Sequence, residues 1–124
     1  MGLMIAALSG CSEAPYPLPD RTSPAVQAEE SRLATLLPGA LLWAPGSCEV
    51  RLLGTEGSSS FAWAECMTNP TADLASGGFS KPVRVDGEQV RGPVDGTGHK
   101  ESIEALFPQR LADAVLNEPE RLYP

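Results

Sequence analysis

Two short segments, CEVRLL (residues 48–53) and FAWAEC (residues 61–66), decide the fold of this chain. Both alternate between two kinds of side chain, which is typical of a strand whose two faces meet different surroundings. The segment between them, GTEGSSS (residues 54–60), has the composition of a turn. If the chain folds back in the middle of this turn, Cys48 lies directly opposite Cys66. The sequence therefore predicts an antiparallel hairpin with that register.

The same register divides the side chains of the hairpin between two faces of a sheet. One face is apolar and small, and we expect it to lie in the core because small side chains let a helix approach closely. It consists of Cys48, Val50, Leu52, Ala62, Ala64 and Cys66. The opposite face carries aromatic and charged side chains, and we expect it to be exposed. It consists of Glu49, Arg51, Phe61, Trp63 and Glu65.

A helix is predicted before the hairpin. Ser23 followed by Pro24 is a typical helix start, and apolar residues recur after it at helical spacing. Pro38-Gly39 is expected to end this helix, and Trp43 is expected to close one end of the core.

A loop, a second hairpin and two short helices are predicted after the first hairpin. Residues 68–80 show no sustained period and are expected to form the loop. Asp86-Gly87, between alternating valines, predicts a two-residue turn that places Val83 opposite Val90. The last apolar stripe, from Ile103 to Leu116, is interrupted by Pro108, which indicates two short helices rather than one.

The order of these elements predicts an α+β fold. We expect an antiparallel sheet of about four strands, made of two hairpins, with the N-terminal helix and the short C-terminal helices packed on one face. The chain has 124 residues, which is enough for one domain, expected over residues 24–124.

The charge balance excludes some classes of partner. Nine basic residues stand against 16 acidic ones, for a net charge of −7. Such a protein repels phosphate backbones, which argues against nucleic-acid binding and against electrostatic docking on anionic lipid. No run of 18 apolar residues is present, so no segment is predicted to span a membrane.

The N-terminal residues resemble the signal of a bacterial lipoprotein. An apolar run ends in Leu8-Ser9-Gly10-Cys11, which matches the lipobox: an aliphatic residue, two small residues and a cysteine. In lipoproteins this thiol is linked to a diacylglycerol and the chain is cut before it. The resemblance implies that residues 1–10 are the remnant of a signal peptide. It also implies that acylated Cys11 holds the protein in the lipid bilayer, on the extracytoplasmic face of the cell membrane.

One feature departs from this pattern. A signal peptide carries Lys or Arg before its apolar stretch, and Met1-Gly2 contains neither. We interpret this as a translation start that lies further upstream. The alternative is a soluble protein with an apolar N-terminus. Residues 11–23, with prolines at three positions, favour an extended backbone and are expected to form a stiff tether.

The cysteine count agrees with this interpretation. If Cys11 is acylated, Cys48 and Cys66 form an even pair in an oxidising compartment. In a non-hydrogen-bonded antiparallel pair the Cα atoms come within about 4.5 Å, inside the range of a disulfide. A metal site would need two more soft ligands, and the chain offers only His99, so neither a metal nor a cofactor is predicted.

The mixed face of the first hairpin is the only cluster with candidate chemistry. An exposed Trp63 and Phe61, flanked by Arg51, Glu49 and Glu65, predict a protein-binding patch. A second interpretation is a small secreted hydrolase, in which the paired carboxylates of Glu49 and Glu65 act as acid and base beside Trp63. A third is a solvated charge cluster in which Arg51 neutralises both carboxylates.

Three stretches in the second half of the chain resemble small uncharacterised lipoproteins of actinobacteria. They are Pro82 to Gly87, Ile103 to Pro108 and Leu111 to Asp113. This resemblance implies no activity. We therefore expect a membrane-anchored protein without enzymatic activity, an adaptor or inhibitor whose partner is another envelope or secreted protein. The hydrolase remains the alternative.

Overall fold

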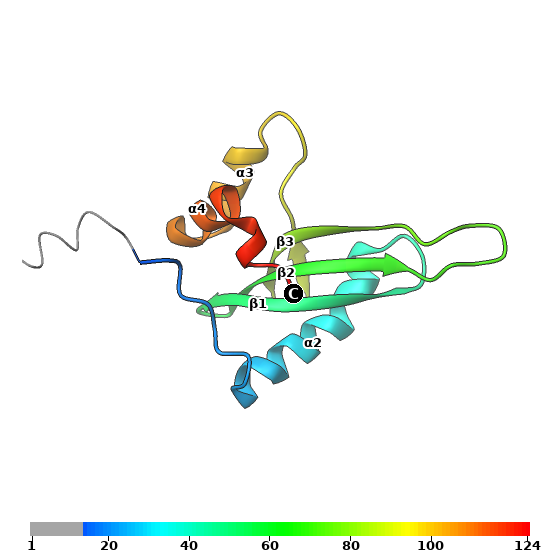
Figure 1. The fold of residues 1–124 in the computed structure, drawn as a ribbon, viewed down its shortest axis with the longest axis horizontal. Coiled ribbons are helices and arrows are strands. Elements are labelled where there is room, and N and C mark those ends of the chain that lie inside the picture. Colours follow the sequence, from blue (N-terminus) through cyan, green and yellow to red (C-terminus); the bar gives the residue numbers. More distant parts are fainter. Residues whose placement is uncertain (1–13) are drawn as a thin grey trace, which may run out of the picture.

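The computed structural model describes residues 14–124, and its helices and strands follow the predicted order (Figure 1). A long helix, α2 (Pro24–Leu41), precedes four strands and three short helical segments. The strands are β1 (Gly46–Glu56), β2 (Ser59–Thr68), β3 (Gly78–Asp86) and β4 (Gln89–Arg91). The helical segments are α3 (His99–Leu106), α4 (Gln109–Asn117) and the 3-10 turn η1 (Pro119–Arg121). The fold is α+β, as predicted.

The strands form one antiparallel sheet in the order β1-β2-β3-β4. The predicted register of the first hairpin is confirmed, with Cys48 opposite Cys66 and Leu52 opposite Ala62. Beyond Leu52 the pairing shifts by one residue, so that Gly54 lies opposite Phe61. Leu53 is the extra residue of this β-bulge, and its side chain is fully buried.

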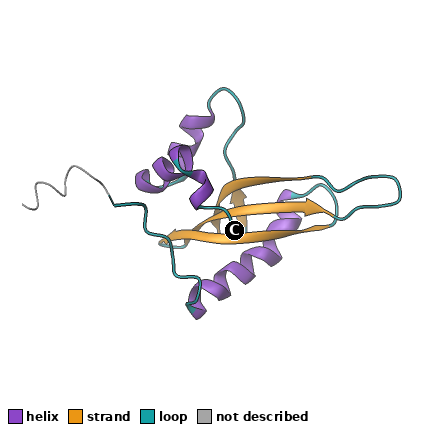
Figure 2. Ribbon diagram, viewed as in Figure 1, coloured by secondary structure: helices purple, strands orange, loops and turns teal. Residues whose placement is uncertain are grey.

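The helices cover both faces of the sheet, so the prediction that all of them pack on one face is wrong (Figure 2). The small apolar face packs against α2 through Leu33 and Leu37, as its composition led us to expect. The opposite face packs against α3 and α4 through Ile103 and Leu111. Sequence alternation assigned this second face to solvent, but the amphipathic C-terminal helices bury their own apolar stripe against it.

The second hairpin is present with a different register. Asp86 pairs with Gln89 and Val85 with Val90, so the two turn residues are Gly87 and Glu88 rather than Asp86 and Gly87. Gly87 has a φ of 67°, a left-handed conformation that glycine adopts without strain. The turn moves by one residue because Asp86 belongs to the strand, where its carboxylate accepts hydrogen bonds from Ser59, Arg84 and Arg91.

Helix α2 extends beyond the predicted end at Pro38-Gly39. It continues to Leu41, and the amide of Leu42 donates to the carbonyl of Pro38 at 3.0 Å. Leu41 and Leu42 pack against the apolar cluster beneath the helix, and this packing compensates for the unfavourable Pro and Gly. The chain then turns toward β1, and Trp43 does not close the core, since 68% of its surface is exposed.

Residues 14–23 pack along the domain, although a stiff tether outside the domain was expected. The hydroxyl of Tyr16 donates to the carbonyl of Leu53 at 2.8 Å, and Tyr16 and Leu18 contact the apolar cluster beneath α4. The guanidinium of Arg121 donates to the carbonyl of Tyr16 at 3.2 Å, and that of Arg110 donates to the carbonyl of Ala14 at 3.3 Å. The domain therefore includes this segment and begins before residue 24. Residues 11–13 of the predicted tether lie outside the described residues.

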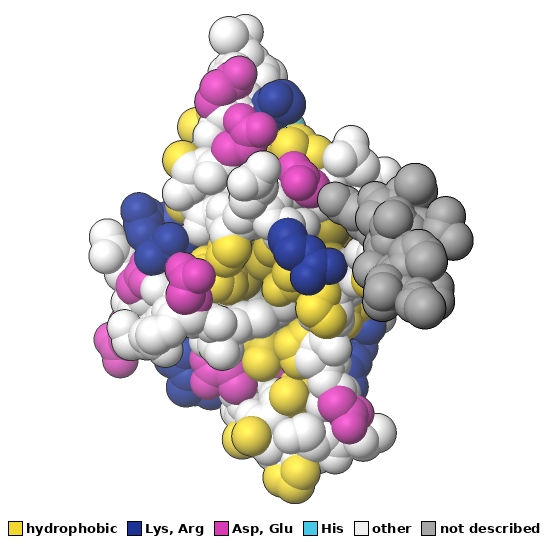
Figure 3. All heavy atoms as spheres, turned by 90° about the vertical axis from the view of Figure 1, so that its left-hand side faces the viewer, with side chains coloured by type: hydrophobic (Ala, Val, Ile, Leu, Met, Phe, Trp, Pro, Cys, Tyr) yellow, Lys and Arg dark blue, Asp and Glu magenta, His cyan; other side chains and the backbone are white. Residues whose placement is uncertain are grey.

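The long axis of the molecule runs along the first hairpin (Figure 1). Residues 14–16 lie near one end of this axis, which we call the proximal end. The loop of residues 69–77 projects from the other end, which we call the distal end. Figure 3 views the proximal end, where apolar side chains form a band bordered by basic and acidic ones. The two ends therefore face opposite directions.

Candidate functional site

The predicted protein-binding patch does not exist as an exposed surface. Phe61 and Trp63 are buried, with 1% and 6% of their surfaces exposed. The ring of Phe61 meets that of Phe107 edge to face at 5.8 Å, and the ring of Trp63 meets that of Tyr123 at 5.0 Å. The C-terminal segment covers both aromatic side chains, so they stabilise the fold instead of facing a partner.

Arg51 fastens the C-terminal residues to β1. Its guanidinium donates to the carbonyls of Arg121 at 3.0 Å and Tyr123 at 3.2 Å. Burial lowers the pKa of Arg51, and the neighbouring Arg21 acts in the same direction. No carboxylate of the described chain forms an ion pair with Arg51. The interpretation in which Arg51 neutralises Glu49 and Glu65 is therefore wrong.

Glu49 and Glu65 are cross-strand neighbours, as predicted. The hydroxyl of Ser80 donates to Glu65 at 3.1 Å and accepts a hydrogen bond from the indole Nε1 of Trp63 at 2.8 Å. Glu49 is exposed, and neither carboxylate takes part in an ion pair within residues 14–124. Acid–base catalysis by paired carboxylates needs a site that excludes water, and Glu49 is exposed. The hydrolase therefore remains a prediction that this geometry does not favour.

The predicted disulfide joins Cys48 to Cys66, with their Cα atoms 4.0 Å apart. This short separation is typical of a non-hydrogen-bonded pair, in which the backbone N–H and C=O groups of both residues point away from each other. The disulfide therefore joins the strands at a position where the backbone N–H and C=O groups of Cys48 point toward the outer edge of β1. Leu8, Ser9, Gly10 and Cys11 of the lipobox lie outside the described residues.

Three of the exposed large apolar side chains of the described residues gather at the distal end, and the sequence pattern had not pointed to them as a group. We call this group the distal surface, and it consists of Trp43, Met67 and Leu74, which expose 68%, 51% and 71% of their surfaces. A methyl group built on Gly77 would lie 3.2 Å from Cζ2 of Trp43, so the indole ring rests against the loop of residues 69–77. The three side chains come from three segments that meet only in the folded chain.

Hydrogen bonds hold the loop that carries Leu74. The N–H of Gly77 donates to Oγ1 of Thr68 at 2.9 Å, and the carbonyl of Gly77 accepts from the amide of Thr68 at 2.7 Å. Thr71 and Leu74 close a turn inside the loop with bonds of 2.8 and 3.0 Å. The distal surface is therefore preformed, which reduces the entropy lost when a partner binds.

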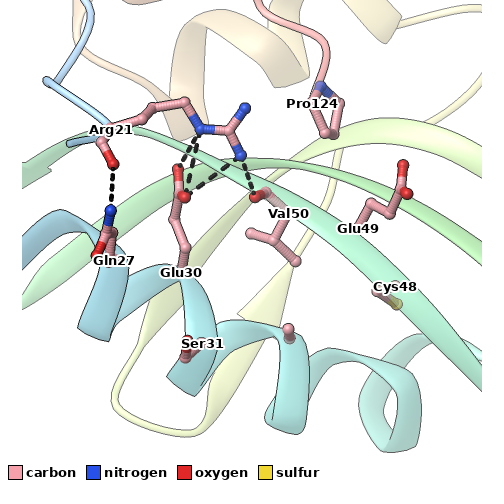
Figure 4. Close-up of a pocket in the computed structure, with 9 residues that line it drawn as sticks. Arg21, Gln27, Glu30, Ser31, Cys48, Glu49, Val50 and Pro124 are labelled. Atoms are coloured by element: carbon pink, nitrogen blue, oxygen red, sulfur yellow. Dashed lines mark hydrogen bonds and ion pairs between the residues drawn. The ribbon is translucent and has the colours of Figure 1, made fainter.

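A groove runs along the outer edge of β1 (Figure 4). It has a volume of about 530 Å³. Cys48 and Val50 of β1 line one side of it, and α2 lines the opposite side through Ser31 and Ala34. Pro124 also borders the groove. The ion pair between Arg21 and Glu30, at 3.2 Å, closes one end.

Neither a metal centre nor a membrane-crossing segment is found in the part of the chain that the structure describes. No group of three or more His, Cys, Asp or Glu side chains converges there. None of its helices combines the length and the apolar composition that crossing a bilayer requires.

Comparison with known proteins found no match to this chain among protein-family models, curated proteins or solved structures. The distal surface was missed because Trp43 precedes Pro45-Gly46 and was assigned to the core. One signal was available in the sequence: Trp43 and Leu74 each lie in a segment without strand or helix periodicity, where burial is least expected.

Proposed function

We propose that this chain is a membrane-anchored protein-binding module on the extracytoplasmic face of the cell membrane. It acts as an adaptor or inhibitor without catalytic activity of its own, and it binds its partner through the distal surface. The observation that carries the proposal is the exposure of Trp43 on a preformed end of the domain. A tryptophan that is exposed in the free protein lowers its solubility. Tryptophan is also among the residues most enriched at binding hot spots, where a partner buries it.

Two features support the extracytoplasmic location. The lipobox ending at Cys11 resembles a lipidation signal, and a disulfide between Cys48 and Cys66 is typical of oxidising compartments. An anchor on Cys11 lies three residues before Ala14, which is at the proximal end. The distal surface then points away from the anchored bilayer, toward other proteins of the envelope.

The experiment is crosslinking in the native cell followed by affinity capture and mass spectrometry. We expect Trp43→Ala, or Leu74→Ala, to abolish capture of a specific envelope or secreted protein. Val94→Ala is the matched control, because Val94 is also a large apolar residue, is half exposed and lies outside the distal surface. Capture of the same proteins by wild type and Trp43→Ala would contradict the proposal.

The lipid anchor has a separate test. The native protein should carry a diacylglyceryl group on Cys11 and begin at that residue, as mass spectrometry of the N-terminal peptide would show. Cys11→Ser should release the protein from membranes. An intact Met1, or an unmodified Cys11 in the native protein, would refute the anchor without affecting the argument for the distal surface.

A further inference from the structure

Strand β1 is an outer strand of the sheet, so every second residue turns its backbone N–H and C=O away from β2. Two side-chain contacts show which residues these are. The carbonyl of Val50 accepts from Arg21 at 3.1 Å, and the amide of Leu52 donates to Glu30 at 2.8 Å. By the same alternation, the N–H and C=O of Cys48 and the N–H of Val50 also point outward.

The protein covers one half of this edge with its own side chains. Arg21, Glu30 and Tyr16 bind the outward backbone groups of Val50, Leu52 and Leu53 in turn. An unpaired strand edge invites pairing with another chain, and such covers are a common protection. Toward Gly46, these side-chain hydrogen bonds end at the carbonyl of Val50. Within the described chain, no side chain bonds to the backbone of Cys48 or to the amide of Val50.

The uncovered half of the edge lines one side of the groove in Figure 4. The wall provided by α2 presents Ser31 and Ala34, which are small and leave room for side chains of an added strand. The other side carries Glu49, which has no basic partner among residues 14–124 and lies opposite Glu65 in the register. Two adjacent carboxylates without a counter-ion favour a basic ligand.

We propose that the edge of β1 from Gly46 to Val50 binds an extended segment of a partner protein as a fifth strand, with apolar side chains toward Ala34 and a Lys or Arg toward Glu49. This inference rests on the proposed function, because it names the form in which the partner binds. Backbone hydrogen bonds to an edge strand supply affinity, and alternate side-chain contacts supply specificity. Gly46 follows closely after Trp43, so one partner can engage the groove and the distal surface together.

The probe is a library of random dodecapeptides displayed on phage and selected against the full chain with its disulfide intact. We expect enriched peptides in which apolar and basic residues alternate. Synthetic copies of these peptides would then be titrated against wild type and two variants of α2. Ser31→Trp places a large side chain in the groove from an exposed position, and Ala28→Trp makes the same addition at an exposed position that does not line the groove.

The expected result is a loss of affinity of at least tenfold with Ser31→Trp and no change with Ala28→Trp. Amide hydrogen exchange gives a second readout, because a peptide that contacts side chains only would leave the exchange of the β1 amides unchanged. In the free protein the amides of Cys48 and Val50 should exchange quickly, while those of Glu49 and Arg51, which pair with β2, are protected. Bound peptide should protect Cys48 and Val50.

Several results would overturn the inference. One is the absence of any enriched peptide, and another is peptide binding that leaves Cys48 and Val50 unprotected. Binding that is lost with Trp43→Ala but unaffected by Ser31→Trp would place the peptide on the distal surface and leave the proposed function standing. A dimer of the chain alone that Ser31→Trp dissociates in sedimentation would show that the edge pairs with a second copy instead.

Discussion

The two tryptophans of this chain have opposite expected roles, and the same substitution tests both. Trp63 is almost fully buried, whereas Trp43 keeps only about a third of its surface covered. With roughly 200 Å² per tryptophan and about 25 cal/mol per Å², burial contributes about 5 kcal/mol at Trp63 and about 1.5 kcal/mol at Trp43. Both values are upper estimates, because an unfolded chain already covers part of this area.

We therefore expect Trp63→Ala to lower the free energy of unfolding by about 3 to 5 kcal/mol and Trp43→Ala by about 1 kcal/mol or less. Urea unfolding followed by circular dichroism measures both. If Trp63→Ala does not fold, Trp63→Phe serves instead. It keeps a ring against Tyr123 but loses the indole hydrogen bond to Ser80, and it should cost about 1 to 2 kcal/mol.

Fluorescence separates the two side chains without reference to stability. In Trp43→Ala the remaining indole is Trp63, which should emit at short wavelength and resist quenching by acrylamide. In Trp63→Phe the remaining indole is Trp43, which should emit at long wavelength and be quenched readily. A large loss of stability with Trp43→Ala, or a neutral Trp63→Ala, would refute the assignment of Trp43 to the surface and of Trp63 to the core.

Three further predictions concern the disulfide, the second hairpin and the N-terminal segment. Replacing Cys48 and Cys66 together with Ala should lower the free energy of unfolding by about 3 kcal/mol, since the bond closes a loop with a sequence separation of 18; an unchanged urea midpoint would contradict this. Hydrogen bonds from Ser59 and the nearby arginines lower the pKa of Asp86 from 3.8 to about 2. The contribution of Asp86 to stability is therefore complete above about pH 4 and is lost as the pH falls toward 2. Asp86→Asn should remove this part of the pH dependence of the free energy of unfolding, measured by urea titration. A pH profile identical to that of wild type would count against this prediction. Tyr16→Phe removes the hydrogen bond to the carbonyl of Leu53 and should lower the free energy of unfolding by about 1 kcal/mol. It should also speed proteolysis of residues 14–23. Equal protease resistance of the variant and wild type would disprove this prediction.

The first hairpin was predictable because its determinants are local. Alternation, a polar turn and two cysteines at matching positions allow one register, and a slip of one residue would exchange the faces. The second hairpin was less predictable, because Asp86, which the Asp-Gly pair places in the turn, lies in β3 and accepts hydrogen bonds from Ser59 and Arg84. These contacts outweighed the local preference of Asp-Gly for the turn, and the one from Ser59 comes from 27 residues away in the sequence.

The face of the sheet that carries Phe61 and Trp63 could not be assigned from the hairpin alone. Beside charged neighbours such as Arg51, the two aromatic residues have the pattern of an exposed face. The deciding contact comes from Phe107 and Tyr123, more than 40 residues away in sequence. The apolar stripe of the C-terminal helices must be buried against some surface. This stripe was the indirect sequence signal that the second face of the sheet is covered.

If Cys11 is acylated, as we propose, the attachment of residues 14–23 to the domain limits how far the molecule can search for partners. Left free, ten residues can extend by roughly 35 Å, whereas from Cys11 to Ala14 the chain can span only roughly 10 Å. A protein acylated at Cys11 would thus work at a nearly constant height above the lipid headgroups. It would select for partners that are themselves held in that thin layer, and it would encounter them by lateral diffusion in two dimensions.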